Sequence, residues 1–301
     1  MNIKIYIEFI YLIILGILTS LSLSPFNYFI INFLTFSLFY LFLIKKFNRY
    51  SNKGLSFFYG WLFGFGYFIS SLYWISISLT YDDNFKFLIP LTLILIPTFL
   101  GLFYGLVSYL FLILRPKEDI SSFITFALIF GIIEFIRGSI LTGFPWNLIV
   151  YSFSKNLELI NITSIIGTYG LNLFCISLFT SPAIIFLGFN KKSVGIFIFF
   201  IITIIFFYGH NYSNKKKFYK ASNKNFEYKL KIIGSNISLD RFYQKTDTIS
   251  VIEDLIVLSN PDKSEKTIFI WPEGIISNDI DEKLSQIKSL IESNFNENHF
   301  L

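Results

Sequence analysis

Seven long apolar runs constrain this chain more than any other feature. A helix needs about 20 apolar residues to cross a bilayer. The runs lie at residues 5–23, 27–44, 55–79, 87–114, 120–138, 163–188 and 193–209. With 53% hydrophobic and 15% charged residues, the composition also lies outside the range typical of soluble domains. The sequence therefore predicts a multi-span α-helical membrane bundle of about seven transmembrane helices.

Charged residues divide the chain into two parts. Residues 210–301 contain 26 charged side chains, against 19 in residues 1–209. We interpret residues 1–210 as a polytopic transmembrane domain, the Asn-, Lys- and Ser-rich residues 211–225 as a linker, and residues 226–301 as an extracytoplasmic domain. Most basic residues flank apolar runs, so the formal net charge of +5 does not indicate a nucleic-acid partner.

Loop charges predict the orientation in the membrane. Short loops rich in Lys and Arg stay in the cytoplasm. The loops richest in these residues are the N-terminus, 45–53, 115–119 and 189–192, and they alternate with poorer loops at 23–26, 80–86 and 139–162. We therefore expect a cytoplasmic N-terminus and, after seven crossings, an extracytoplasmic C-terminal domain.

One charged pair lies inside an apolar run. Glu134 and Arg137 are three residues apart, close enough on one helix face to pair. Ionisable residues in a span usually face the bundle interior or a cavity. A pair that neutralises itself can instead reach the outer interface. The sequence leaves both interpretations open.

An aromatic loop follows this pair. Phe144, Pro145 and Trp146 stand between the fifth and sixth runs. Aromatic residues at this depth are typical of an interfacial anchor, and they would equally suit the edge of a lipid-accessible groove. Both alternatives make the loop a candidate lipid contact.

The C-terminal segment has the pattern of alternating strands and helices. Residues 227–234 alternate polar and apolar side chains, which predicts a strand. A helix is expected near 249–256, a second strand at 267–271, and a helix opened by a capping box at Asp279 and Glu282. This order is the beginning of an α/β layered domain.

A carboxylate follows the second of these strands. Pro272 stops the strand and places Glu273 beside Gly274, with apolar residues on both sides. Partial desolvation there would suit Glu273 to proton transfer. The alternative is a structural carboxylate, solvated or salt-bridged.

The residue inventory indicates no metal or cofactor. Cys175 is the single cysteine and lies within an apolar run, where we expect a protonated, inert core thiol. His210 and His299 are far apart in the sequence and have no partner at a ligand spacing.

With these residues assembled, the sequence resembles bacterial apolipoprotein N-acyltransferase. That family joins a multi-span membrane domain to an extracytoplasmic nitrilase-like domain of α-β-β-α layers. The stretches that carry the resemblance are Leu-Ser-Pro-Phe at 23–26, Gly-Phe-Gly at 64–66, Leu-Tyr-Trp-Ile at 72–75, Glu-Phe-Ile-Arg-Gly at 134–138, Thr-Gly-Phe-Pro-Trp-Asn at 142–147, Gly-Thr-Tyr-Gly-Leu at 167–171, Gly-Ser-Asn-Ile at 234–237 and Ile-Trp-Pro-Glu at 270–273.

The resemblance implies acyl transfer in lipoprotein maturation at the bacterial inner membrane. In the family, a Cys takes an acyl chain from a membrane phospholipid as a thioester and passes it to the diacylglyceryl-cysteine of an apolipoprotein. A Glu acts as general base and a Lys supports the oxyanion. Glu273 matches the base, and Tyr243 falls near a position where the family commonly has Trp. No cofactor is implied, and residues 226–301 would be a partial nitrilase-like domain.

The chain departs from the family in one respect. The family's Lys and Cys lie well downstream of the Trp-Pro-Glu strand, and this sequence ends 28 residues after Glu273. We therefore expect a C-terminally truncated or split product that lacks the acyl-transfer step. Two alternatives are an inactive module that binds lipid or lipoprotein and an unrelated seven-span protein. The unrelated protein would be a transporter or a scaffold; a transporter would be expected to have repeated halves, and the sequence shows no internal repeat.

Overall fold

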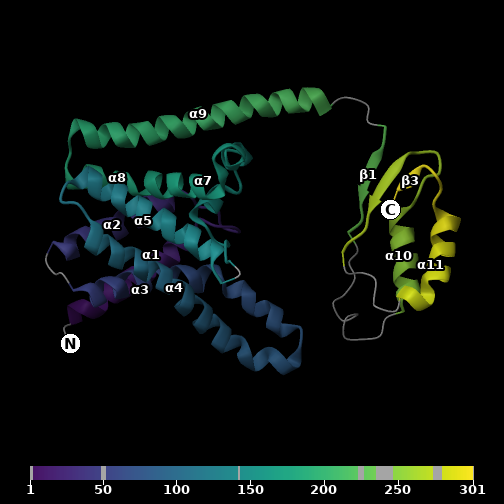
Figure 1. The fold of residues 1–301 in the computed structure, drawn as a ribbon, viewed down its shortest axis with the longest axis horizontal. Helices are drawn as coiled ribbons and strands as arrows, with labels where there is room; N and C mark the ends of the chain where they lie inside the picture. The colour runs from purple at the N-terminus through teal and green to yellow at the C-terminus, as the bar shows by residue number, and fades with distance from the viewer. Residues whose placement is uncertain are drawn as a thin grey trace. The chain divides into compact units, whose positions relative to one another are not determined.

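The chain divides into a helical unit and a smaller α/β unit. In the computed structural model, the first unit comprises Met1–Phe218 and the second Tyr219–Leu301. The structure describes residues 3–48, 52–141, 143–222, 227–234, 247–273 and 280–300. Figure 1 shows the helices of the first unit and the parallel strands and helices of the second.

Each of the seven predicted apolar runs forms helix in the first unit. The α-helices are α1 (Ile3–Ser20), α2 (Ile31–Phe47), α3 (Lys53–Ser71), α4 (Ile89–Leu114), α5 (Asp119–Ser139), α6 (Leu157–Ile160), α7 (Thr163–Thr180), α8 (Pro182–Leu187) and α9 (Lys191–Ser222). Three 3-10 helices lie between them: η1 (Tyr73–Thr80), η2 (Asp83–Leu88) and η3 (Ile149–Phe153). The third run continues from α3 into η1, and the sixth is shared by α7 and α8.

Several of these helices have the length and apolarity that a membrane crossing needs. Within the described residues there are four such helices: Asp83–Leu114, Asp119–Ser139, Thr163–Leu187 and Lys191–Lys216. The pair α3 and η1, bent by 44°, makes a fifth if it counts as one span. Helix α2, with 17 residues, and the shorter apolar helix Ile5–Ser20 fall below this length. The helical membrane bundle is confirmed, and the number of seven crossings stays a prediction.

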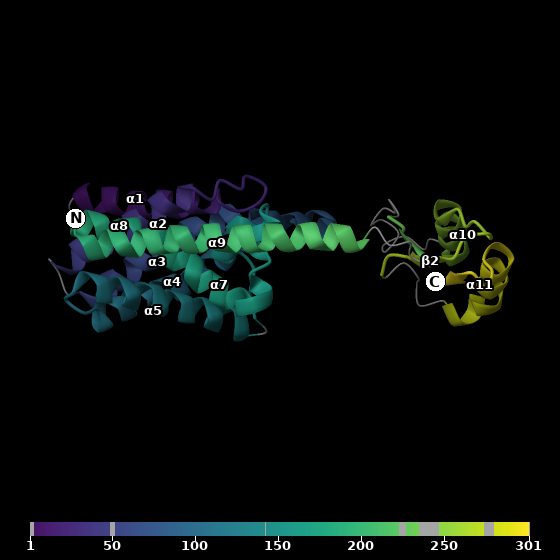
Figure 2. The same cartoon turned by 90° about the horizontal axis from the view of Figure 1, so that it is seen from above.

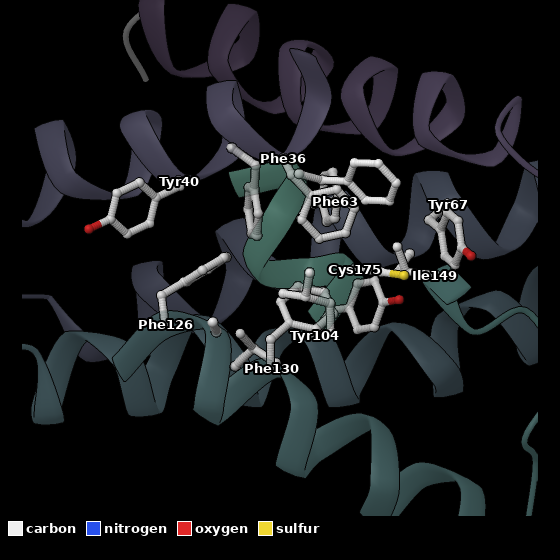
Figure 3. Close-up of a cluster of buried hydrophobic side chains, with 14 of the residues drawn as sticks. Phe36, Tyr40, Phe63, Tyr67, Tyr104, Phe126, Phe130, Ile149 and Cys175 are labelled. Carbon is white, nitrogen blue, oxygen red and sulfur yellow. The ribbon is translucent and has the colours of Figure 1, made fainter. Parts of the chain in front are cut away.

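Aromatic side chains from α2, α3, α4 and α5 form the centre of the bundle (Figure 3). Phe39 stacks on Phe63 with ring centroids 4.1 Å apart, and Tyr104 meets Phe130 edge to face at 4.8 Å. Cys175 of α7 is fully buried in this cluster, as the sequence predicts for a core thiol.

Glycines bring α3 into backbone contact with its neighbours on two sides. A Cβ atom added to Gly16 of α1 would lie 2.1 Å from the carbonyl oxygen of Phe63, and one added to Gly60 would lie 2.1 Å from that of Tyr104. Small residues at such positions let membrane helices approach closely. Helix α3 is therefore held tightly between α1 and α4.

Most of the predicted linker, residues 211–222, is helical. Helix α9 continues unbroken from Lys191 to Ser222, and Figures 1 and 2 show it as one rod. Adding a turn to an existing helix requires no new nucleus, so polar residues readily extend it. Asn211 also donates a hydrogen bond to the carbonyl oxygen of Glu158 at 2.7 Å, and Lys215 pairs with the Glu158 carboxylate at 2.7 Å.

The second unit contains a three-stranded parallel sheet in the order β1-β2-β3. Its elements are β1 (Lys229–Ile232), α10 (Thr248–Ser259), β2 (Thr267–Ile270), α11 (Ile280–Asn294) and β3 (His299–Phe300). The predicted strands and helices are confirmed, whereas β3 was not expected from the sequence. The predicted capping residue Asp279 lies outside the described residues.

The two faces of this sheet differ. Helices α10 and α11 share a core with Phe269, built from Ile252 and Leu255 of α10 and Ile287 of α11. On the opposite face, the exposed apolar side chains are Tyr228, Leu230, Ile232, Ile268, Ile270 and Phe300. The described sheet therefore has one covered and one uncovered apolar face, and a nitrilase-like domain remains a prediction.

Candidate functional site

The charged pair of α5 is buried inside the bundle. The side chains of Glu134 and Arg137 both have 0% exposure. Two hydrogen bonds join them: Arg137 Nη2 to Glu134 Oε2 at 2.7 Å and Arg137 Nε to Glu134 Oε1 at 3.2 Å. Of the two interpretations that the sequence left open, the structure shows the interior one. Snorkelling to the interface is therefore wrong, because the partners that satisfy this pair lie within the protein.

Arg137 also holds the aromatic loop. Its Nη1 atom donates to the carbonyl oxygens of Phe144 at 2.7 Å and Trp146 at 3.0 Å. Its guanidinium carbon lies 5.2 Å from the centre of the Phe68 ring. The planar guanidinium has five N–H donors in a fixed arrangement, and here it bridges one carboxylate and two backbone carbonyls. The sequence motif therefore corresponds to one connected unit of structure.

Helix α3 fixes the far end of the same loop. The Tyr67 hydroxyl donates to the carbonyl oxygen of Asn147 at 2.7 Å. The side-chain amide of Asn147 donates to the carbonyl oxygen of Ser71 at 3.2 Å. Asn147 has a φ of 56° and Gly143 a φ of 79°, a left-handed conformation that costs energy for residues other than glycine. Fixed partners at both ends hold the loop in this shape.

Two open hollows lie on this part of the surface. One, of about 390 Å³, is formed by α4 and the start of the loop; its lining residues are Leu95, Ile96, Phe99, Leu100, Leu141, Gly143 and Phe144. The other, of about 370 Å³, is lined by Pro145, Trp146, Asn147 and Tyr151. The Trp146 ring lies 5.5 Å from that of Trp74, and both are exposed. The loop thus carries lining residues of both hollows.

The sequence identified part of this site. Glu134, Arg137, Phe144, Pro145 and Trp146 come together as the predicted motif block. Tyr67 and Phe68 were missed, because they reach the site from another helix and look like ordinary core aromatics in the sequence. Asn147 directly follows Trp146 in the motif, and its position next to an aromatic loop was the one available signal.

Glu273 belongs to the second unit and its surroundings differ from the expectation. It follows β2 and Pro272, as predicted, but its side chain is exposed. Within the described residues, the partial desolvation expected for Glu273 is therefore wrong. The neighbouring Trp271 donates its indole N–H to the Ser259 hydroxyl at 2.9 Å, which ties the strand end to α10.

One further candidate from the sequence, Tyr243, lies outside the described residues. In the part of the chain that the structure describes, no group of three or more His, Cys, Asp or Glu side chains could hold a metal ion.

Comparison with known proteins places these features in a family. Residues 15–181 match the model of the apolipoprotein N-acyltransferase N-terminal domain. An apolipoprotein N-acyltransferase of Rhodopseudomonas palustris is 36% identical over 176 residues, which cover 58% of this chain and 32% of that protein. One of Brucella melitensis is 28% identical over 273 residues, which cover 87% of this chain and 50% of that protein.

The match therefore extends over a limited part of those proteins. The chain spans between a third and a half of the length of these relatives. Together with the apolar helices, the likeness identifies a bacterial membrane protein. The matched region covers more than half of the chain and includes the buried pair and the loop that it holds. The chain belongs to the apolipoprotein N-acyltransferase family.

Proposed function

We propose that this protein serves the transfer of a fatty acyl chain from a membrane phospholipid to the N-terminal diacylglyceryl-cysteine of apolipoproteins. The observation that carries the proposal is the family match over residues 15–181, the region that contains the ordered aromatic loop and its two hollows. The chemistry of a long acyl chain suits an apolar hollow on a membrane helix.

The hollow beside α4 is our candidate for the acyl chain. Its lining is almost wholly apolar, from Leu95, Ile96 and Phe99 on α4 to Phe144 on the loop. Trp74 and Trp146 lie nearby with exposed rings, and tryptophan prefers the level of the lipid headgroups. A phospholipid at this depth would place its chain along α4 and its headgroup near the tryptophans.

We further propose Glu273 as the general base of the reaction. It lies just beyond the carboxyl end of β2, and ligands of open α/β sheets bind at the carboxyl ends of their strands. The parallel strands and the helices packed on one sheet face also support a nitrilase-like character for this unit. The family's Lys and Cys have no match within residues 1–301.

The thiol chemistry sets a limit on what these residues do alone. Cys175 is fully buried among aromatic side chains, where neither a base nor a phospholipid ester can reach it. We therefore expect no acyl thioester on residues 1–301 by themselves. This observation favours a second candidate function, the binding of phospholipid or lipoprotein without transfer.

Loop positions support the proposed orientation. Arg115, after α4, donates to the side chain of Asn48, after α2, at 2.5 Å, so these two basic loops lie at the same end of the bundle. Basic loops favour the cytoplasmic side. We propose seven crossings in the inner membrane, a cytoplasmic N-terminus and an extracytoplasmic second unit.

A photoreactive phospholipid tests lipid binding. The full chain in nanodiscs is irradiated with a phospholipid that carries a diazirine on its acyl chain, and labelled peptides are identified by mass spectrometry. We expect labels concentrated in residues 95–100 and 141–147. The exposed apolar face of α9 is the matched control surface, and equal labelling there would contradict a specific lipid site.

The transfer step needs a separate assay. A radiolabelled phospholipid is incubated with the protein, and protein-bound label is challenged with hydroxylamine, which cleaves thioesters. We expect lipid binding without a hydroxylamine-sensitive label. A thioester on this chain would show that it completes the first half of the reaction and would refute the binding-only function.

A further inference from the structure

The contacts of Arg137 exceed what an ion pair needs. A single carboxylate would satisfy its charge, yet the guanidinium also donates to the carbonyl oxygens of Phe144 and Trp146. These carbonyls lie on either side of Pro145, which has no backbone N–H to anchor the chain. Arg137 therefore reaches into the middle of the loop from the helix that precedes it.

Glu134 fixes the direction of this reach. Its two carboxylate oxygens accept from Nη2 and Nε, which leaves Nη1 directed toward the loop. Paired hydrogen bonds of this kind define the orientation of the guanidinium plane. The Phe68 ring packs against the same guanidinium. Among the hydrogen bonds of the described residues, those of Glu134 reach the loop through Arg137.

The same loop carries residues of both hollows. Gly143 and Phe144 line the hollow beside α4, and Pro145, Trp146 and Asn147 line the other. The two carbonyls held by Arg137 belong to one residue from each group. A change in the guanidinium would therefore alter both hollows at once.

We propose that Glu134 and Arg137 are a positioning pair, which sets the conformation of the loop 143–147 and thereby the shape of the two hollows beside it. Both side chains are fully buried, so the pair acts through the loop that it holds. This proposal rests on the proposed function in one respect, that a lipid chain occupies the hollows. The conformation of the loop can be measured without any ligand.

Trp146 provides the reporter for the test. The chain contains four tryptophans, and replacing Trp61, Trp74 and Trp271 by Phe leaves Trp146 as the single one. The full chain is placed in nanodiscs of phosphatidylethanolamine and phosphatidylglycerol, with and without phosphatidylcholine brominated on its acyl chains. Bromine quenches tryptophan at short range, so quenching and emission maximum report the loop position relative to the lipid.

The decisive variant replaces the pair by apolar residues. A buried ion pair exchanged for apolar side chains of similar volume often leaves stability unchanged or raised. We expect Glu134→Met/Arg137→Met to keep its thermal midpoint near that of the parent, while bromine quenching of Trp146 changes about twofold, because the loop carbonyls lose their donors. An unchanged midpoint with unchanged quenching and emission would overturn the proposal.

A second variant covers a failure of the double variant to fold. Arg137→Lys keeps the positive charge beside Glu134, but an ammonium cannot bridge a carboxylate and two carbonyls in the same plane. We expect its Trp146 quenching to shift about twofold as well, because the fork geometry is lost. Parent-like quenching in this variant would mean that charge alone suffices and would refute the positioning role.

Arg115→Met is the matched control. Arg115 bonds to Asn48 and to the carbonyl oxygen of Ile44 and makes none of the loop contacts of Arg137. We expect parent-like Trp146 quenching, and a shift equal to that of the pair variants would contradict a specific effect of Glu134 and Arg137. Photolabelling separates the two proposals: a shifted loop without lipid labels refutes the lipid site alone, and lipid labels without a shifted loop refute the positioning pair.

Discussion

The two units of this protein treat charge in opposite ways. In the first, Glu134 and Arg137 are enclosed by the bundle and satisfy each other and the loop. In the second, pairs such as Lys229 and Glu265 lie at the surface with side-chain exposures of 62% and 38%, and Glu273 is exposed as well. A buried charge depends on its partner, whereas an exposed charge has water as a substitute.

This contrast teaches where single substitutions act. Buried groups, whose partners water cannot replace, determine the stability and the shape of each unit. Charged pairs at the surface contribute little. In the first unit the determining features are a buried polar pair and the close helix contacts that glycines allow. In the second they are the apolar residues between sheet and helices. The four predictions below test this difference, from the largest expected effect to the smallest.

Removing one member of the buried pair should have the largest effect. Arg137→Met leaves Glu134 buried without a partner, which costs about 3–5 kcal/mol of unfolding free energy. Thermal and denaturant unfolding in detergent micelles measures the loss. The double variant Glu134→Met/Arg137→Met should recover most of it, and equal losses in the single and double variants would contradict a partner-dependent charge.

A core truncation in the second unit comes next. Leu255 of α10 has 0% exposure, so Leu255→Ala should lower the stability of this unit by about 2–5 kcal/mol. Hydrogen exchange of α10 and β2 amides in the full chain reports this unit separately. Leu258 lies on the same helix with 53% exposure, and Leu258→Ala should change exchange little. Similar effects of both would mean that the sheet and helices do not share the core described.

The contact between α1 and α3 should tolerate no side chain. A Cβ on Gly16 meets the carbonyl oxygen of Phe63 at 2.1 Å, so Gly16→Ala must push the helices apart at about 1–3 kcal/mol. At Gly195 of α9, no described atom apart from the adjacent residues and the helix's own nearby backbone lies within 4 Å of the place that a Cβ would take. Gly195→Ala should raise stability by about 0.5–1 kcal/mol, because alanine favours helix. Unfolding in detergent micelles measures the change in unfolding free energy for both variants. A change of the same sign in both would refute the close packing of α1 and α3.

The smallest effect concerns pH and a surface pair. The hydrogen bond from Lys283 lowers the pKa of the Asp247 carboxyl below its ordinary value of 3.8. A folded-state pKa below the unfolded one stabilises the fold above the unfolded value, and this contribution is lost as the pH falls through the folded value. The protection of α10 amides against exchange, taken relative to their intrinsic exchange rate at each pH, should therefore fall below about pH 4.

Lys283→Gln tests the origin of this pH dependence. Without the ammonium group, the pKa of Asp247 should return toward its ordinary value and the acid dependence of α10 exchange should weaken. The effect is small because the Asp247 side chain is 54% exposed and salt screens such pairs. An acid dependence that is the same in the variant and the parent would assign it to other carboxylates.

Local pattern allowed much of the fold to be predicted. Each of the seven apolar runs became helix, and the strands and helices of the second unit appeared where alternation and stripes placed them. Hydrophobic periodicity is a property of neighbouring residues, so it is readable without knowledge of the fold. The Glu-x-x-Arg-Gly and Phe-Pro-Trp residues were likewise recognisable as one block.

The errors share a physical cause. Residues 211–225 were interpreted as a linker from their composition, yet residues 211–222 extend α9, and Asn211 and Lys215 in this extension bond to Glu158. Strand β3 was missed because two residues, His299 and Phe300, show no periodicity and pair only with a strand 32 residues away. Glu273 was expected to be desolvated, but exposure depends on residues that are distant in the sequence.

The sequence by itself determined that Glu134 and Arg137 share a helix face and that an aromatic loop follows them. Only the tertiary structure decided that the pair is buried, that Arg137 holds the carbonyls of Phe144 and Trp146, and that Tyr67 secures the end of the loop at Asn147. The reason is that helix periodicity arises from contacts between near neighbours. Burial and hydrogen bonding between helices depend on how separate segments pack, and no single stretch of sequence contains that information.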